Sequence, residues 1–288
     1  MKLERARDHV SESVKEHPAV RWRAGAVSRE LDRLAVEEPL EIRLGGRRFT
    51  LTMRTPGHDE ELVAGFLLSE GFVKSRDELG EVRRVRGVRG APEPNAVDVI
   101  LNVPAAGLRE RLKRNFVISS SCGVCGKTSI EALERRVAPI EDSVRISASM
   151  ILRLPQLMRE AQEVFSATGG LHAAALFALP DGGSDGTGGL SLVVLREDVG
   201  RHNAVDKVIG HALMRAMLPL GRTVMMVSGR VSFEIVQKAA SARIPILCAV
   251  SAPSSLAVEL AEGLGVTLVG FLRESNFNVY SRSERIVT

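Results

Sequence analysis

The last third of the chain alternates short, wholly apolar runs with amphipathic segments. The apolar runs predict strands over 221–230, 244–253 and 266–273, and the intervening segments predict helices over 232–243 and 254–265. Runs without polar alternation are typical of a sheet covered on both faces, and strand-helix-strand units give parallel neighbours. This part of the chain is therefore predicted to form a layered α/β sheet.

The middle of the chain predicts a helix, a hairpin and a second helix. Helical spacing begins at about Leu154 and stops at Gly169-Gly170. Two apolar runs, 171–179 and 190–197, then flank the glycine-rich stretch 182–189. Because this stretch lacks the lysine of a phosphate loop, we interpret it as a mobile hairpin connection. The second helix is predicted over 199–217.

The N-terminal part predicts a small α+β unit. Residue types alternate on both sides of Gly45-Gly46, which predicts a β-hairpin over 39–54 with a two-residue turn. A helix is expected from Thr55-Pro56 to Gly71, because three acidic residues lie in its first turn, where the helix dipole favours them. A strand should begin at Ala96, after a turn over 92–95. The expected buried face of the helix consists of Leu62, Phe66 and Leu67.

Length and composition favour two domains. The chain has 288 residues, of which 44% are hydrophobic, so it can bury one or two ordinary cores. We predict a small α+β domain over 1–118 and a larger α/β domain over 119–288.

Charge argues against a nucleic-acid or membrane partner. The chain contains 39 Lys and Arg residues and 35 Asp and Glu residues, which gives a net charge of +4. The densest basic run, 81–90, alternates arginines with valines and has no aromatic residue for base stacking, so a solvated strand or loop is the better interpretation. No apolar run approaches the ~18 residues of a membrane helix, and the charged N-terminus does not resemble a signal peptide. We expect a cytoplasmic protein.

The strongest chemical signal is a C-x-x-C at Cys122 and Cys125, inside the stretch 116–129. The pattern predicts a strand, a glycine-flanked loop and a helix. A cysteine acts as a nucleophile only as its thiolate, and Lys127 and the positive helix N-terminus would both favour that form. In a reducing compartment such a pair is catalytic or metal-binding rather than a structural disulfide. The third cysteine, Cys248, lies in an apolar strand and is expected to be buried.

Four interpretations of this loop compete. Residues 121–128 match a phosphate loop except at the first glycine, but the cysteines have no role in that motif. His58, Glu60 and the C-x-x-C match the ligand and acid pattern of a zinc deaminase, without its proline. A thioredoxin-like redox site rests on C-G-x-C alone, and a structural zinc site would need Cys248. The fourth interpretation is sulfur transfer.

Beyond the cysteine loop, the chain contains a set of distinctive stretches that run from residue 55 almost to the C-terminus. These stretches are TPGHDEELVAGFLLSEGF, SSCGVCGK, FSATGGLHAAALF, REDVGRHNAVDKVIG, SGRVSFEIVQKAA, SAPSSLAVELAEGLGVTLVGFLR and FNVYS. Through them the chain resembles the formate dehydrogenase accessory sulfurtransferase family, FdhD. The sequence as a whole therefore favours sulfur transfer.

The resemblance implies a function and partners. Such a protein takes sulfur from a cysteine desulfurase as a cysteine persulfide and passes it to the bis-molybdopterin guanine dinucleotide cofactor, which then activates formate dehydrogenase. It implies a homodimer whose C-terminal domain resembles the cytidine deaminase fold without its zinc chemistry, so no metal site is expected. Residue by residue, Cys122 would carry the persulfide and Cys125 would assist it. The implied cofactor-binding residues are Phe271, Leu272, Arg273, Glu274, Ser275 and Asn276, and GDP would mimic the cofactor.

The carboxyl ends of the predicted strands independently indicate a ligand site at the edge of the sheet that contains 271–276. Ligands of such sheets bind outside the carboxyl ends of the strands, here 228–230, 251–255 and 271–276. Ser232 and Ser254 or Ser255 are also candidate helix caps. The polar segment from Asp198 to Lys207 is either a capped helix start or a cofactor or dimer contact. His172 is either a core histidine or a pterin contact.

Overall fold

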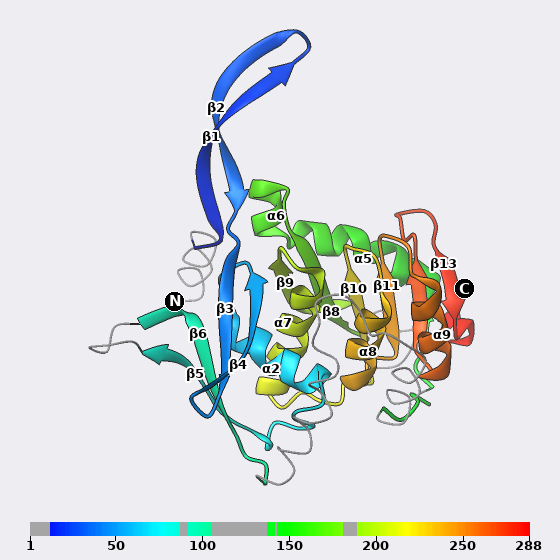
Figure 1. The fold of residues 1–288 in the computed structure, drawn as a ribbon. Coiled ribbons are helices and arrows are strands. Elements are labelled where there is room, and N and C mark those ends of the chain that lie inside the picture. The colour runs from blue at the N-terminus through cyan, green and yellow to red at the C-terminus, as the bar shows by residue number, and fades with distance from the viewer. Residues whose placement is uncertain (1–11, 87–91, 105–136, 142, 181–188) are drawn as a thin grey trace.

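The computed structural model describes residues 12–86, 92–104, 137–141, 143–180 and 189–288, and these form a mixed α/β fold (Figure 1). The largest element is a six-stranded sheet in the order β13-β12-β11-β10-β8-β9. Neighbours β10, β11 and β12 are parallel, as predicted, and the outer strands are antiparallel. The strands are β8 (His172–Ala178), β9 (Ser191–Asp198), β10 (Thr223–Val227), β11 (Ile246–Ala249), β12 (Thr267–Gly270) and β13 (Asn278–Ser281).

Helices cover both faces of this sheet. Along β10, Met225 and Val227 belong to one core cluster, whereas Val224 and Met226 belong to another. The first cluster includes side chains of α7, α8 and α9, and the second those of α5. This alternation is why wholly apolar runs form these strands. The helices are α5 (Ala148–Glu160), α6 (Glu163–Thr168), α7 (Arg201–Met214), α8 (Phe233–Ser241) and α9 (Ser255–Gly263).

The helix expected from Leu154 begins earlier and is broken. Ser147 caps α5, its Oγ accepting a hydrogen bond from the Met150 amide at 3.3 Å, so the helix runs through Pro155 instead of starting there. It ends at Glu160. The backbone N–H groups of Val164 and Phe165 then donate to the Glu197 carboxylate, which starts α6 separately. The predicted stop at Gly169 is confirmed, with a φ of 68°.

The N-terminal sheet has the strand order β4-β3-β6-β5. Its hairpin is confirmed, with Gly45 and Gly46 at positive φ in the turn. The turn expected over 92–95 is wrong, because β6 begins at Pro92. Pairing with β3 covers only 96–99, so the prolines of β6 lie outside the stretch that pairs with β3, and their missing N–H groups cost no hydrogen bond to that strand. The strands are β3 (Glu38–Leu44), β4 (Arg47–Arg54), β5 (Leu79–Arg86) and β6 (Pro92–Leu101).

Helix α2 (Asp59–Ser69) joins this sheet to the larger one. It lies against α7, and one core cluster contains Leu40 and Val97 together with Val205 and Ile235. The predicted acidic first turn and the buried Leu62 and Leu67 are confirmed, whereas Phe66 is half-buried. The predicted domain boundary falls within 105–136, outside the described residues, and stays a prediction.

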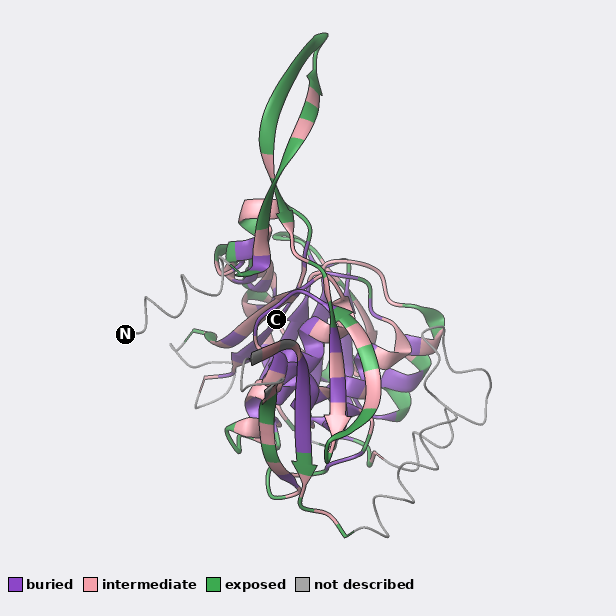
Figure 2. Ribbon diagram, turned by 60° about the vertical axis from the view of Figure 1, so that its left-hand side comes forward, coloured by how far each residue is buried: buried purple, intermediate pink, exposed green. Residues whose placement is uncertain are grey.

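A long hairpin rises from the body and was not predicted. We call it the arm: β1 (Val14–Arg23) and β2 (Ala26–Ala35), turning at Ala24-Gly25 (Figure 1). Figure 2 shows it standing clear of the buried sheets. The described residues hold no helix long and apolar enough to cross a membrane. The remaining short elements are β7 (Ile146–Ser147), β14 (Ile286–Val287) and a 3₁₀ turn (Ser283–Arg285).

Candidate functional site

A cleft of about 690 Å³ lies at the carboxyl ends of the parallel strands. Its wall combines α5 and α6 with the start of β8 and the residues that follow β10 and β11. The position is the one that the strand-end rule predicts. The volume is within the range of pockets that bind small molecules. Residues on the wall include Met158, Arg159, Phe165, Gly170, His172, Ser228, Val250 and Glu274.

His172 begins β8 at the base of this cleft. The His172 ring packs closely on the loop that follows β10, where a Cβ at Gly229 would lie 3.3 Å from the His172 Nδ1. Ser228 holds the strand here, its Oγ accepting from the Ala173 amide at 2.9 Å. Burial, and then the charge of Arg201, lower the pKa of His172 below its ordinary value. The imidazole is therefore neutral at pH 7 and offers a ligand one donor and one acceptor.

Positive charge gathers beside His172. Arg201 begins α7 and Arg230 follows β10, and the charges of both lower the pKa of His172. The Nε of Arg201 is buried without a hydrogen-bond partner among the described residues. A buried donor without a partner costs free energy, and an anion would satisfy it. The backbone N–H groups at the N-terminus of α7 favour an anion at the same place.

His202 is held in a fixed orientation. Its Nε2 lies 2.8 Å from a carboxylate oxygen of Glu234 and 3.1 Å from the Oγ of Ser232. The hydrogen bond from His202 lowers the pKa of Glu234. Both oxygens are on the same ring nitrogen, so these three residues do not form a Ser-His-acid triad, in which the acid binds the other nitrogen.

The other polar residues of the segment from Asp198 to Lys207 are structural. Lys207 is fully buried, with its Nζ 2.7 Å from Asp198 and 2.9 Å from the Thr55 carbonyl oxygen. Asn203 donates to the carbonyl oxygen of Met53 at 2.7 Å. These contacts join the start of α7 to the loop before α2. Within the segment from Asp198 to Lys207, the side chains of Arg201 and His202 are therefore the candidates to contact a ligand.

The segment 271–276 lies at the same edge, with its side chains in different environments. Leu272 is buried in the core, whereas Glu274 lines the cleft. Phe271 is exposed and has a φ of 52°. Arg273 donates to the carbonyl oxygens of Val250 and Leu272. These backbone bonds fix its guanidinium near the end of β11.

Cys122 and Cys125 lie within 105–136, outside the described residues. Cys248 is buried as predicted, and burial raises the pKa of its thiol far above the ordinary range. Ser254 is confirmed as the cap of α9, accepting from the Ala257 amide at 3.2 Å. Ser232 precedes α8 without a capping hydrogen bond and contacts His202 instead.

Metal ligation finds no support within the described ranges, where no group of three or more His, Cys, Asp or Glu side chains could hold a metal ion. His58, the first residue of the deaminase-like motif, lies 3.7 Å from Glu61. Its neighbour Asp59 forms a buried ion pair with Arg54 at 2.9 Å. The zinc deaminase interpretation is therefore not favoured.

Sequence reasoning missed the contribution of α5 and α6 to the wall. Arg159 stacks on the ring of Phe165, with its guanidinium carbon 4.5 Å from the ring centroid. Both line the cleft from helices that pack on one face of the sheet. Spacing along the sequence predicted a helix here, but nothing in it indicated which end of the helix reaches the strand ends.

The chain is similar to known proteins whose descriptions are related. The FdhD/NarQ family model matches residues 35–287. "Sulfur carrier protein FdhD" from Mycolicibacterium paratuberculosis is 53% identical over 270 residues, covering 91% of this chain and 95% of that protein. The protein of that name from Streptomyces coelicolor is 50% identical, covering 93% of each. A solved structure of a formate dehydrogenase accessory protein from Desulfotalea psychrophila superposes with a TM-score of 0.71 at 26% identity, covering 95% of this chain and 99% of the other.

Proposed function

Since the chain belongs to the FdhD/NarQ family, we propose that it carries sulfur for the maturation of formate dehydrogenase. The observation that supports this most directly is the family match over 35–287, which includes both the C-x-x-C and the cleft. In finer terms, the protein receives sulfur from a cysteine desulfurase. It holds this sulfur as a persulfide on Cys122 and delivers it to the bis-molybdopterin guanine dinucleotide cofactor.

Loading is a sulfur exchange between two cysteines. The Cys122 thiolate attacks the outer sulfur of the donor's persulfide, the sulfur–sulfur bond of the donor breaks, and the donor cysteine leaves as a thiolate. No external oxidant or reductant is needed. Cys122 now carries the outer sulfur.

Release as sulfide requires two electrons, and Cys125 supplies them. Its thiolate attacks the Cys122 sulfur, a Cys122–Cys125 disulfide forms, and the outer sulfur leaves as HS⁻. The two cysteines are oxidised as the outer sulfur is reduced. A cellular dithiol must then reduce the disulfide before the next cycle. This role explains a second cysteine three positions after the first.

The cleft suits the nucleotide half of the cofactor. Its volume is adequate for one nucleotide, and a diphosphate would satisfy the buried Nε of Arg201 and the N–H groups of α7. Arg230 and Arg273 add charge at the same edge, and neutral His172 can hydrogen-bond a ring. GDP should therefore bind here as a mimic of the cofactor. We also propose that the protein is a cytoplasmic homodimer.

Complementation tests the proposal. A strain that lacks its own sulfur carrier for formate dehydrogenase should regain formate dehydrogenase activity when it expresses this chain. Cys122→Ala should give no activity although the protein accumulates normally, and Cys248→Ala, a change at a buried thiol, should retain activity. Full activity with Cys122→Ala would refute the persulfide role.

A further inference from the structure

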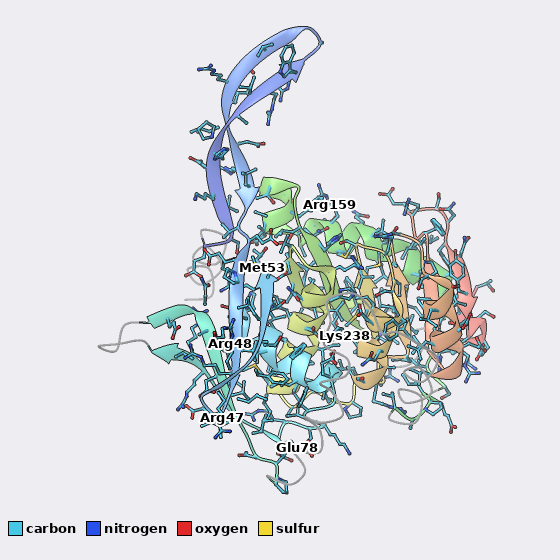
Figure 3. All side chains as sticks on the ribbon, in the orientation of Figure 1. Arg47, Arg48, Met53, Glu78, Arg159 and Lys238 are labelled. Atoms are coloured by element: carbon cyan, nitrogen blue, oxygen red, sulfur yellow. The ribbon has the colours of Figure 1, made fainter. Side chains whose placement is uncertain are left out.

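Arg159 brings a guanidinium to the wall of the cleft that α5 and α6 form. The residue is exposed, and Figure 3 shows it where α5 meets α6. Its contact with Phe165, at 4.5 Å from the ring centroid, holds the guanidinium but uses none of its N–H donors. Among the described residues, Arg159 makes no hydrogen bond and no ion pair. It therefore presents a positioned set of donors to the cleft.

Glu274 brings a carboxylate to the same cleft from the turn after β12. The backbone of this turn is fixed, because the Arg273 amide donates to the Asn276 carbonyl oxygen at 2.8 Å. The Leu272 amide donates to the Ala249 carbonyl oxygen at 3.0 Å, which joins the turn to the end of β11. The carboxylate itself has no hydrogen-bond or ion-pair partner within the described part of the chain. Glu274 therefore presents two acceptor oxygens on a fixed backbone.

A cation and an anion thus line one cleft, and within the described residues they do not pair with each other. Met158 and Val250 add apolar surface to the same wall. The complementary ligand has apolar faces, an edge of acceptors for the guanidinium and an edge of donors for the carboxylate. These are the properties of a flat heterocycle with both oxo and amino groups.

Guanine has this pattern of edges. Its oxo oxygen and a ring nitrogen form an acceptor pair that arginine binds with two hydrogen bonds. Its ring N–H and exocyclic amino group form a donor pair that suits a carboxylate, and such charge-assisted bonds are the stronger ones. The pterin ring carries the same amino-oxo edge. Adenine reverses both edges, since its amino group would face Arg159 and an acceptor nitrogen would face Glu274.

We propose that Arg159 and Glu274 together select an amino-oxo heterocycle of the cofactor, Arg159 by the oxo edge and Glu274 by the amino edge. This inference rests on the proposed function, which supplies a ligand with such rings. His172 lines the cleft and adjoins Arg201 across Gly229, so a nucleotide whose ring lies here can extend its phosphates toward α7. Arg159 and Glu274 determine which ring is bound, whereas Arg201 favours any diphosphate.

A free amino acid fits the cleft less well. Its carboxylate could pair with Arg159 and its ammonium group with Glu274. It is too small to fill a cleft of about 690 Å³, and it would leave the apolar surface of Met158 and Val250 uncovered. A heterocycle covers this surface and pairs with both charges.

Calorimetric titration of the full-length chain with three nucleotides tests the proposal. GDP, inosine diphosphate (IDP) and ADP have the same ribose and diphosphate, so differences in affinity report on the ring alone. IDP lacks the exocyclic amino group and should bind at least about tenfold more weakly than GDP, the low end for a hydrogen bond to a charged group. ADP mismatches both residues and should bind at least about a hundredfold more weakly than GDP. Equal affinities for GDP and ADP would overturn the proposal.

Two variants separate the two roles, and both replace exposed side chains. Glu274→Ala should make GDP and IDP bind alike, because the amino group no longer has an acceptor. Arg159→Ala should weaken both nucleotides at least about tenfold without changing their ratio, since both rings have the same oxo edge. Glu259→Ala, exposed on α9 at the other face of the sheet, is the control and should bind as the wild type does. The proposal fails if Glu274→Ala keeps the preference for GDP over IDP, or if alanine displaces GDP from the wild type.

Hydroxymethylpterin, which has neither ribose nor phosphate, identifies the ring of the cofactor that binds here. Pterin binding that Glu274→Ala abolishes assigns the site to the pterin, and binding of GDP alone assigns it to the guanine. Both results support the proposal, whereas binding of neither ligand rejects it. Sulfur loading, followed by intact mass, keeps this result apart from the proposed function. Arg159→Ala and Glu274→Ala should load as the wild type does, and a wild type that loads sulfur without ring preference rejects the ring site alone.

Discussion

Gly65 of α2 and Gly210 of α7 meet where the two helices cross. A Cβ at Gly65 would lie 2.9 Å from the Gly210 nitrogen, and a Cβ at Gly210 would lie 2.7 Å from the Gly65 nitrogen. Real Cβ atoms do not approach other atoms this closely, so the crossing requires glycine on both helices. The N-terminal sheet is fixed to the larger sheet through this contact.

Gly210→Ala should therefore destabilise the protein by at least about 3 kcal/mol, the upper end of the usual cost of overpacking. Backbone atoms on both sides leave no flexible side chain to move aside. The free energy of unfolding in urea measures this loss. Gly170→Ala is the matched control, since its Cβ would make an ordinary 3.5 Å contact with Ala35. If Gly210→Ala and Gly170→Ala were equally stable, α2 and α7 would be able to move apart without cost, which would contradict the prediction.

Glu61 is the second link between α2 and α7. Burial raises its pKa, but hydrogen bonds from His211 and Arg196, at 2.9 and 2.7 Å, outweigh burial and hold the pKa well below the usual range. Because the pKa of Glu61 is lower in the folded than in the unfolded protein, its ionised carboxylate stabilises the fold at pH values above the unfolded pKa of about 4.3. This contribution is lost progressively as the pH falls from that value toward the folded pKa.

Glu61→Gln should cost about 3 kcal/mol at pH 7, because it leaves the largely buried guanidinium of Arg196 without its carboxylate. The variant should also lose stability less steeply than the wild type as the pH falls below about 4.3, since its side chain no longer titrates. Urea unfolding from pH 7 down to pH 3 tests both expectations. Parallel pH profiles of the two proteins would exclude this role.

Two arginines next to residues of the cleft wall, Arg201 beside His172 and Arg273 beside Val250, should determine nucleotide affinity. Arg201→Ala and Arg273→Ala should each weaken GDP binding by at least ~1.5 kcal/mol, the low end for a charged hydrogen bond. Calorimetric titration measures the change. Arg145→Ala is the control, because Arg145 is exposed and donates to the neighbouring carbonyl oxygens of Ser143 and Val144. If Arg273→Ala binds as the wild type does and Arg201→Ala does not, the nucleotide lies on the α7 side of the cleft.

Strand periodicity predicted much of the fold. Fully apolar runs identified β10, β11 and β12 because burial on both faces leaves no room for polar alternation. The turn at Gly45-Gly46 identified its hairpin because both residues need positive φ. In these elements, the local sequence preference and the pattern of burial predict the same secondary structure.

The arm was missed and the start of α5 was misplaced, because local sequence preference and burial agree less well in these two elements. Trp22 and Leu31 alternate with charged residues, but neither packs on the body, so the pattern resembles a charged terminus. At α5, Pro155 resembles a first helical residue, whereas the cap at Ser147 starts the helix earlier. The strand ends located the cleft. Tertiary contacts, which residue spacing cannot reveal, determine which side chain faces the cleft among Asp198, Arg201 and Lys207.

Intact-protein mass spectrometry after incubation with a cysteine desulfurase and cysteine tests the central claim most directly. The wild-type chain should gain the mass of one sulfur, which a thiol reductant removes. Cys122→Ala should gain none, whereas Cys248→Ala should gain it like the wild type, because Cys248 is buried and its thiol stays protonated. An unchanged wild-type mass, or a sulfur that remains bound to Cys122→Ala, would contradict the assignment of Cys122 as the sulfur carrier.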